Sequence, residues 1–262
     1  MAAVLSAAVS CVSGPSGEFQ FDLLTTNDVH GSWFDSTYVG GQVKNSLMAI
    51  NTYVNEYRDS LGKDNVLLVD AGDCLQGDNA AYYFNYVDTL SPHLFPRLAA
   101  YMKYDAVCVG NHDVETGHPV YDRVTKELKA NGIPFLAGNA VRSDGKTWFD
   151  GVKILKRHGV KIAVLGYTNA NIRAWLDEPL WKGMEFKSLI PLVQEDVDRV
   201  RTKEKPQVVI VAVHSGTGLG DGTIYESQGK DLLQTLRGVD FLVCSHDHSA
   251  LAIQQDSICL IN

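Results

Sequence analysis

The chain has 262 residues, of which 45% are apolar and 21% are charged, and these proportions are those of a globular protein with a sizeable core. Its formal net charge of −8 argues against a nucleic-acid polymer as partner, because proteins that bind one neutralise its phosphates with a basic face. A small anionic substrate is compatible with this charge if metal ions supply positive charge locally.

The first 18 residues differ in composition from the rest. "MAAVLSAAVSC" is a run of small apolar residues that ends at Cys11, and "VSGPSG" after it is typical of a flexible tether. The run resembles a secretory signal without its positive residues, or a bacterial lipoprotein signal with Cys11 as the lipidated residue. We therefore expect residues 1–18 to be a signal- or lipoprotein-like segment, and the protein to be exported to the periplasm or cell envelope. The alternative is a frayed terminus with a chance cysteine.

Strand-like and helical patterns alternate through the first half of the remaining chain. "FQFDLLTT" carries apolar residues at alternate positions and is predicted as a strand, whereas residues 42–61 have the periodicity of an amphipathic helix. "NVLLVD" follows as a short buried strand. A helix that includes residues 94–102 precedes a strand at 106–110, and a further helix ends at Asn131-Gly132.

The second half begins with two strands around a tight turn at His158-Gly159, so a hairpin interrupts the alternation. A helix around residues 190–200 then precedes the strand "QVVIVAVH", a helix over about 226–237 leads into the strand "VDFLVCS", and "SICLIN" is predicted as the last strand. Alternation with some antiparallel pairing indicates an α/β protein whose helices cover mixed sheets. We expect one domain over residues 19–262.

Polar side chains that bind metals or transfer protons follow five of the predicted strands. They are Asn27, Asp28 and His30; Asp70 and Asp73; Asn111, His112, Asp113 and Glu115; His214; and His246, Asp247 and His248. One such ending is common in loops. However, ligands of α/β proteins bind at the carboxyl ends of the strands, so five endings in succession predict side chains around one crevice.

The types of these side chains fit two divalent cations. Imidazole suits transition metals, while carboxylate and amide oxygens suit harder ions. In the first and last of these loops, two candidate ligands stand two residues apart, so both can point inward. Asp73 is the natural bridge, because one carboxylate can hold two cations about 3.5–4 Å apart. Asn111 supplies a neutral oxygen.

The order of the motifs carries a family resemblance. "DVH", "GD", "GNHD", "HSG" and "HDH" resemble the signature of the calcineurin-like metallophosphoesterases, and "TTNDVHG" with "GNHDVETG" is similar to their 5′-nucleotidase/2′,3′-cyclic phosphodiesterase branch. The resemblance covers residues 19–262. It implies a four-layer αββα sandwich of two mixed sheets with a dinuclear metal centre.

The resemblance also implies roles for the matching positions. The first metal would be held by Asp28, His30, Asp73 and His248. The second metal would be held by Asp73, Asn111, His214 and His246. His112 matches the catalytic histidine, and Glu115 stands where the family has the carboxylate that pairs with it. The two divalent ions would be Mn, Zn, Fe, Co or Mg.

Three departures from the family pattern stand out. Glu115 replaces an aspartate and is one methylene longer, and Ser245 stands where the family usually has glycine. The nucleotidases also carry a C-terminal domain whose aromatic and arginine residues hold the nucleoside, whereas this sequence ends at "LIN". We expect no such domain in this chain, and we expect the catalytic domain to lack its last strands. A separately encoded nucleoside-binding domain is therefore a candidate partner.

The favoured function is dinuclear-metal-dependent hydrolysis of a phosphate ester, either a 5′-nucleotide or a related small nucleotide. His112 would protonate the leaving group, Glu115 would orient His112, and Asp113 is interpreted as structural. One alternative is a metal-binding subunit that is inactive or weakly active without a separate nucleoside-recognition domain. The other alternative is a sulfur-ester hydrolase of the same fold.

Other conspicuous residues are interpreted as structural. His93, His118 and His158 are assigned to a helix start, the first turn of a helix and a hairpin tip. "HSGTGLGDG" lacks the Lys-Ser/Thr that completes a P-loop, so its glycines are expected to let the chain pass close to the metals. For the segment from Trp175 to Trp181, packing within a loop is favoured over a place at the rim of the cleft.

Overall fold

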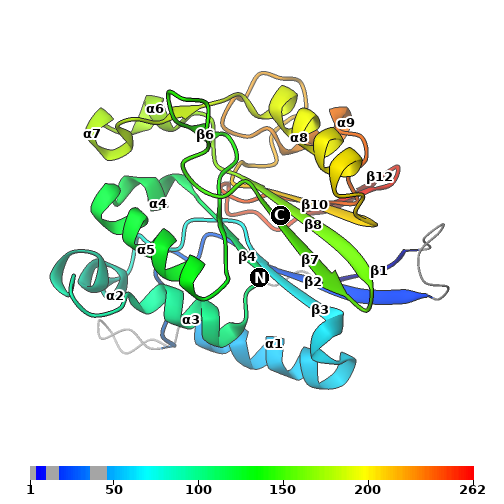
Figure 1. Cartoon of the computed structure of the whole chain (residues 1–262), viewed down its shortest axis with the longest axis horizontal. Helices are drawn as coiled ribbons and strands as arrows, with labels where there is room; N and C mark the ends of the chain where they lie inside the picture. The colour runs from blue at the N-terminus through cyan, green and yellow to red at the C-terminus, as the bar shows by residue number, and fades with distance from the viewer. Residues whose placement is uncertain (1–3, 10–17, 36–45) are drawn as a thin grey trace.

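A computed structural model describes residues 4–9, 18–35 and 46–262 of the chain (Figure 1). Cys11, the candidate lipidated residue, lies outside the described residues, as do residues 42–45 of the first predicted helix. That helix, α1, begins at Leu47, because Ser46 has an extended backbone and its hydroxyl accepts a hydrogen bond from the N–H of Ala49. Its predicted start at residue 42 is therefore wrong by five residues.

The first sheet has five strands in the order β1-β2-β3-β4-β5. The strands are β1 Val4–Val9, β2 Phe19–Thr26, β3 Val66–Asp70, β4 Ala106–Cys108 and β5 Phe135–Leu136. β2 to β5 run parallel, and β1 pairs antiparallel with β2. β1 is not among the predicted strands, since it falls in the segment interpreted as a signal.

The second sheet has six strands in the order β12-β13-β11-β10-β8-β7. The strands are β7 Val152–Arg157, β8 Val160–Tyr167, β10 Val208–Val213, β11 Phe241–Val243, β12 Ala252–Gln255 and β13 Ile258–Ile261. The four central strands are parallel, and β7 and β12 pair antiparallel at the two edges. Both sheets are therefore mixed, as predicted. β6 (Ala140–Val141) and β9 (Glu185–Phe186) form a separate two-stranded sheet that the sequence patterns did not predict.

Helices cover the outer face of each sheet (Figure 1). The first sheet carries α1 Leu47–Leu61, α3 Leu94–Met102 and α5 His118–Ala130, and the second carries α8 Leu189–Lys203 and α9 Gly229–Thr235. The shorter helices are η1 Lys63–Asn65, α2 Asn79–Tyr82, η2 Tyr83–Val87, α4 Asn111–Glu115, α6 Ile172–Trp175 and α7 Glu178–Trp181. Across the described ranges, none of the helices has the length and apolar character that a membrane-spanning helix requires.

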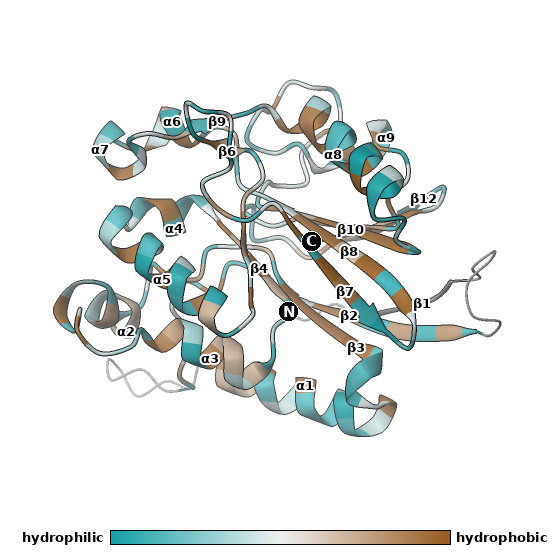
Figure 2. Cartoon of the chain, in the orientation of Figure 1, coloured by the Kyte–Doolittle hydropathy of each residue, from teal (hydrophilic) through white to brown (hydrophobic). Residues whose placement is uncertain are grey.

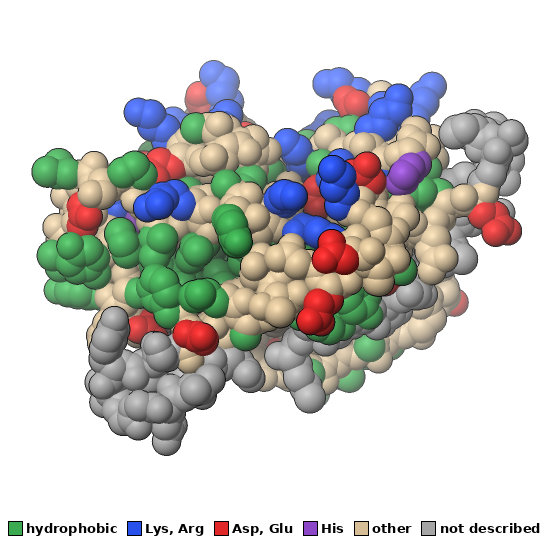
Figure 3. Space-filling model, turned by 90° about the horizontal axis from the view of Figure 1, so that it is seen from below, with side chains coloured by type: hydrophobic (Ala, Val, Ile, Leu, Met, Phe, Trp, Pro, Cys, Tyr) green, Lys and Arg blue, Asp and Glu red, His purple; other side chains and the backbone are tan. Residues whose placement is uncertain are grey.

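Three apolar cores separate four layers, which confirms the αββα sandwich. Alternate residues of β2 show how the layers arise: Phe21 and Leu23 point into the core between the sheets, whereas Leu24 packs toward the helices of the first sheet. Figure 2 shows these apolar strands in the middle of the molecule and mixed, partly hydrophilic helices outside them. Seen from below, hydrophobic side chains gather at one side (Figure 3), and the exposed ones of α2 and η2 include Tyr82, Tyr83 and Val87.

The two sheets meet at Gly166 in β8 too closely for a side chain. A Cβ atom at this position would lie 2.3 Å from the Cβ of Leu136 in β5 and 2.9 Å from the Sγ of Cys108 in β4. The N–H of Gly138 also donates to the carbonyl oxygen of Gly166 at 2.8 Å. Glycine is therefore required here so that the sheets can approach each other.

Replacing Gly166 with alanine is expected to lower the free energy of unfolding by about 1–3 kcal/mol, the usual cost of an extra methyl group in a packed interior. Gly151→Ala is the matched control, because the nearest atom to its Cβ position, the Cα of Gly138, is 3.4 Å away. The control is expected to be neutral or to stabilise by up to about 1 kcal/mol, since alanine restricts the unfolded chain. Urea unfolding measures both, and a Gly166→Ala variant as stable as the control would contradict the required close approach.

Candidate metal centre

The loops that follow β2, β3, β4, β10 and β11 meet at one edge of the packed sheets. Two groups of candidate ligands form there, one of Asp28, His30 and His248 and one of Asp73, His214 and His246. Within each group, one ligand atom from each residue lies within 4.8 Å of the others. The sequence placed these six residues around one crevice, and the structure brings all six together.

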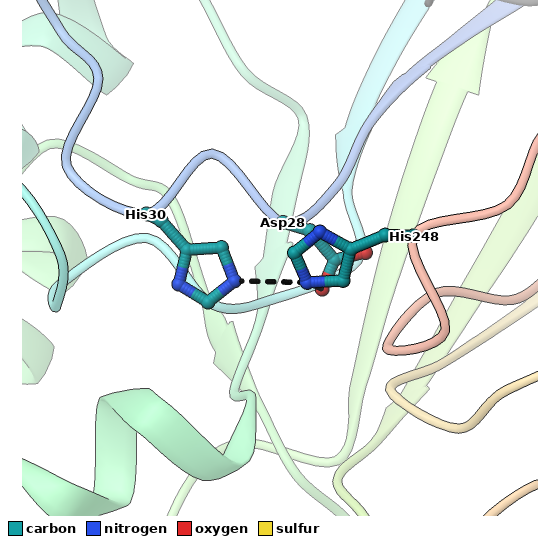
Figure 4. Close-up of side chains that lie close together, drawn as sticks. All are labelled: Asp28, His30 and His248. Atoms are coloured by element: carbon teal, nitrogen blue, oxygen red, sulfur yellow. Dashed lines mark hydrogen bonds and ion pairs between the residues drawn. The ribbon is translucent and has the colours of Figure 1, made fainter.

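In the first group, two imidazoles face each other (Figure 4). The Nε2 atoms of His30 and His248 are 3.2 Å apart, and the Nε2 of His248 is 3.9 Å from the Oδ1 of Asp28. The Nδ1 of His30 is 3.2 Å from the carbonyl oxygen of Gln76, which can only accept, so Nδ1 carries the hydrogen. This tautomer leaves the Nε2 of His30 with a lone pair directed into the group, which fits a cation-binding site.

In the second group, His214 is fully buried and its Nε2 atom lies between two oxygens. It is 3.1 Å from the Oδ2 of Asp73 and 3.0 Å from the Oδ1 of Asn111. The ring of His246 packs edge-on against that of His214. The Oδ2 of Asp73 also lies 3.9 Å from the Nε2 of His30, so this carboxylate stands between the two groups. Imidazole nitrogens, carboxylates and an amide oxygen together form a donor set that suits divalent transition metals.

The charges at the centre affect one another's ionisation. Burial opposes ionisation of Asp73, but the positive charge of His214 and the hydrogen bond from its ring hold the pKa of Asp73 below its ordinary value. In turn, although burial lowers it, Asp73 raises the pKa of His214 to about 9. Burial lowers the pKa values of His30 and His246. The centre thus holds an ionised carboxylate that favours positive charge beside it.

The backbone is strained at these ligands. Among the described residues, nine that are not glycine have positive φ angles, and five of the nine are candidate ligands. These five are Asp28, His30, Asp73, His246 and His248. Each such conformation costs on the order of 1–3 kcal/mol and persists only where surrounding contacts hold it. Such strain is typical of functional sites.

Asp113 supplies contacts that hold the centre. Its buried carboxylate accepts four backbone N–H groups, from Asp73, Cys74, Leu75 and Gly110, at 2.8–3.0 Å. It therefore joins the turn that carries Asp73 to the start of α4, which agrees with its interpretation as structural. Gly110 has to be glycine, because a Cβ atom there would lie 2.0 Å from the Oδ1 of Asp73.

His112 and Glu115 lie at the opening of the centre. The Nδ1 of His112 is 2.5 Å from the Oε2 of Glu115, one turn later in α4, so the longer side chain still reaches its partner. The ring of His112 packs edge-on against that of His30, and the N–H of His112 donates to the Oδ1 of Asp73 at 2.8 Å. The side chains of His112 and Glu115 are 38% and 37% exposed, so a ligand can reach them from solvent.

The remaining polar residues from the strand ends belong to neither group. Asp70 is buried, its Oδ1 accepts the N–H of Gly72 at 2.8 Å, and burial raises its pKa to about 6. Asp247, between the two histidines of its loop, accepts hydrogen bonds from the N–H of Thr217 at 2.8 Å and from the side-chain amide of Asn262 at 2.6 Å. Both carboxylates therefore support the loops that carry the candidate ligands.

For Trp175, the interpretation that its segment packs within a loop was wrong. Its ring stacks on that of His246, with centroids 5.3 Å apart and planes at 20°, and the side chain is partly exposed. It therefore lies at the rim of the centre, whereas Trp181 donates its indole N–H to the carbonyl of Leu176 within the segment and packs against Phe186 of β9. Trp175 ends α6, in the segment that follows β8, another parallel strand, and this position is the signal that could have indicated its place.

The three other histidines, His93, His118 and His158, lie in the predicted places. His93 caps the N-terminus of α3, where burial lowers its pKa to about 3 and its Nδ1 accepts the N–H of Phe95. His118 is the first residue of α5 and pairs with Asp122. His158 lies between β7 and β8 at the tip of the hairpin.

Comparison with known proteins gives one family match and several relatives. A family model described as calcineurin-like phosphoesterase matches residues 21–250. The chain is 24% identical over 224 residues to a 5′-nucleotidase of Vibrio cholerae, an alignment that covers 82% of this chain and 38% of the relative. It is 26% identical over 262 residues to a human 5′-nucleotidase, with coverage of 95% and 42%. The chain thus spans less than half the length of these relatives.

Among solved structures, the calcineurin-like phosphoesterase YfkN from Bacillus subtilis superposes with a TM-score of 0.80 at 19% identity. The superposition covers 92% of this chain and 80% of the YfkN chain. At this level of identity the likeness supports the fold alone, and it agrees with the αββα layers.

Proposed function

The chain belongs to the calcineurin-like phosphoesterase family, and we propose on that basis that it hydrolyses a phosphate ester of a small nucleotide with the help of two divalent metal ions. The observation that carries the proposal is the meeting of two ligand groups at the carboxylate of Asp73. One carboxylate between two sets of imidazoles is what a pair of neighbouring cations requires.

The proposed ligands divide between two ions. The first ion would be held by Asp28, His30, Asp73 and His248, and the second by Asp73, Asn111, His214 and His246. Divalent ions at such a site lower the pKa of water and neutralise charge on the phosphoryl oxygens. The ligand set admits Mn, Zn, Fe, Co or Mg, and we assign none of them.

The groups of the chain that would act on the substrate are those of α4. The Nδ1–H of His112 donates to Glu115, which fixes the ring, and the partly exposed His112 lies beside His30, where a ligand can reach it. From there His112 would donate a proton to the leaving oxygen of the ester. Glu115 would also stabilise the charged form of the imidazole during this transfer.

The nucleotide substrate is proposed from the relatives, which are named 5′-nucleotidases. A separately encoded nucleoside-binding domain stays a proposed partner. The alternative of a metal-binding subunit that needs such a partner is distinguished by turnover: if the isolated chain holds two ions but releases no phosphate from AMP or p-nitrophenyl phosphate, that alternative replaces the proposal.

His112→Ala tests the proposed proton donor. The variant should keep both ions while kcat for AMP falls by roughly 10²–10⁴-fold, the usual contribution of a positioned acid. The loss should be smaller for p-nitrophenyl phosphate, whose leaving group departs without a proton, and Glu115→Gln should show a weaker form of the same trend. Phosphate release with added Mn²⁺ and metal analysis of the protein measure these effects.

His118→Ala is the control for the loss of an imidazole, since His118 lies on α5 and contacts none of the proposed ligands. Its activity should equal that of the wild type. Equal losses on both substrates in His112→Ala would mean that the ring stabilises charge without donating a proton. Loss of an ion would mean that His112 is a ligand.

Asp73→Asn tests the bridge. Because its carboxylate lies between the two groups, the variant is expected to lose both ions together. Asp28→Asn is the comparison, because Asp28 belongs to the first group only, and it should release one ion. Metal analysis after gel filtration measures the stoichiometry, and two ions per chain in Asp73→Asn would exclude a bridging role.

We also propose that the chain is exported and carries a lipid at Cys11, because small apolar residues precede this cysteine. Removal of a leader before Cys11 would take β1 away and leave β2 as an edge strand. Cys11→Ser is expected to move the protein from the membrane fraction to the soluble fraction of its host. A wild-type mass that includes Met1, with the same fractionation for both proteins, would refute the proposal.

A further inference from the structure

Ser245, the residue before His246, is fully buried and contacts two of the other loops that carry proposed ligands. Its Oγ is 2.8 Å from the carbonyl oxygen of Ala71 and 2.9 Å from the Nδ1 of His214. Ala71 follows β3 and precedes the turn of Asp73, while His214 follows β10. One hydroxyl group therefore joins three loops of the centre.

The directions of these hydrogen bonds follow from the chemistry of the partners. The carbonyl oxygen of Ala71 can only accept, so the hydroxyl of Ser245 donates to it. The same carbonyl oxygen is 2.9 Å from the Nδ1 of His214, so Nδ1 also carries a hydrogen. The Nδ1–H of His214 thus faces two oxygens, the carbonyl of Ala71 and the lone pairs of Ser245.

This arrangement determines which nitrogen of His214 faces the ligand group. With a hydrogen held on Nδ1, the Nε2 of His214, which points to Asp73 and Asn111, is the nitrogen that would give up its hydrogen when an ion binds. A histidine binds a metal through the nitrogen that carries no hydrogen, and a partner on the other nitrogen fixes both the tautomer and the direction of the ring. His30 has one such partner, the carbonyl of Gln76, whereas His214 has two.

We propose that Ser245 is a positioning residue that holds His214 in its Nδ1–H form and so sets the affinity of the second group for its ion. The inference rests on the proposed function, because it takes His214 as a ligand. A glycine, the usual residue here in the family that the sequence resembles, has no hydroxyl and makes neither hydrogen bond. The contact therefore distinguishes this chain from relatives that have glycine here, and its partner His214 belongs to the second group only.

Ser245→Ala and Ser215→Ala form a matched pair for testing this. Ser215 is also fully buried and adjoins His214, but its hydroxyl donates to the carbonyl of Glu226 and accepts the N–H of Gln228, away from the proposed ligands. Both variants lose a buried hydroxyl with two hydrogen bonds, so any general effect on stability should be similar. Only Ser245→Ala should alter metal binding.

The measurement is Zn²⁺ binding in competition with a chromophoric chelator, resolved into two affinities. Ser245→Ala should weaken one ion by about 10–100-fold, the usual effect of losing a partner behind a metal-bound histidine, and leave the other within about 3-fold. Ser215→Ala should leave both affinities within about 3-fold of wild type. In the Zn²⁺-loaded protein, the Nδ1 proton of His214 should exchange with water faster in Ser245→Ala, as NMR of ¹⁵N-labelled protein can show.

Ser245→Thr keeps the hydroxyl and should recover most of the affinity lost in Ser245→Ala, which separates the hydrogen bonds from packing. Three results would each overturn the inference: equal weakening of both ions in Ser245→Ala, the same weakening in Ser215→Ala, or unchanged binding in Ser245→Ala. If the wild type still binds two ions, the proposed function stands in all three cases. A wild-type chain that binds no Zn²⁺ would overturn the proposed function and this inference with it.

Discussion

The apolar layer between the two sheets is the contact on which the centre depends. Residues such as Leu23, Val69 and Ile210 are removed from water there, and this burial brings two independent groups of parallel strands face to face. Because the carboxyl ends of both groups lie at the same edge, loops from both sheets open onto one place. Asp28, Asp73 and Asn111 come from the first sheet, whereas His214, His246 and His248 come from the second.

The loops at this edge adopt conformations that they would not adopt alone. Five proposed ligands have left-handed backbones, and their combined cost is several kcal/mol. Hydrogen bonds between loops oppose this cost: the N–H of Asp28 donates to the carbonyl of Gly72, that of His30 donates to the carbonyl of Asp73, and that of His246 donates to the carboxylate of Asp28. The carboxylate of Asp113 adds four more hydrogen bonds. The fold thus stabilises a geometry that serves the site.

Local patterns and the order of the motifs were enough to predict the main elements of the fold and most of the candidate site. The main strands and helices have clear periodicity, and the polar residues at strand ends fall where parallel strands place ligands, as the meeting of Asp28 with His248 shows. The start of α1 was predicted too early because the apolar periodicity extends back to residue 43, whereas the helix begins after its cap at Ser46. Strands of two residues such as β6 are too short for any period to appear.

Distant contacts that no motif indicates could not be predicted from the sequence. The hydroxyl of Ser245 meets Ala71 across 174 positions, and nothing in either neighbourhood indicates that pairing. The stacking of Trp175 on His246 likewise depends on how the loops after β8 and β11 pass each other. Aromatic residues in loops usually pack locally, so the residue type alone favoured the wrong interpretation.

The division of each ligand group between the two sheets has a consequence for folding. His30 and His248 are 218 positions apart, and their ring nitrogens come within hydrogen-bond distance only after both halves of the chain have docked. The unfolded chain has no such arrangement, so an ion bound at this edge would be a cross-link that only the native state possesses. By mass action, each tenfold rise in free metal above its dissociation constant would then add about 1.4 kcal/mol per ion to the resistance of the two halves to separation. The resistance of the protein to unfolding would therefore depend partly on the concentration of free metal around it.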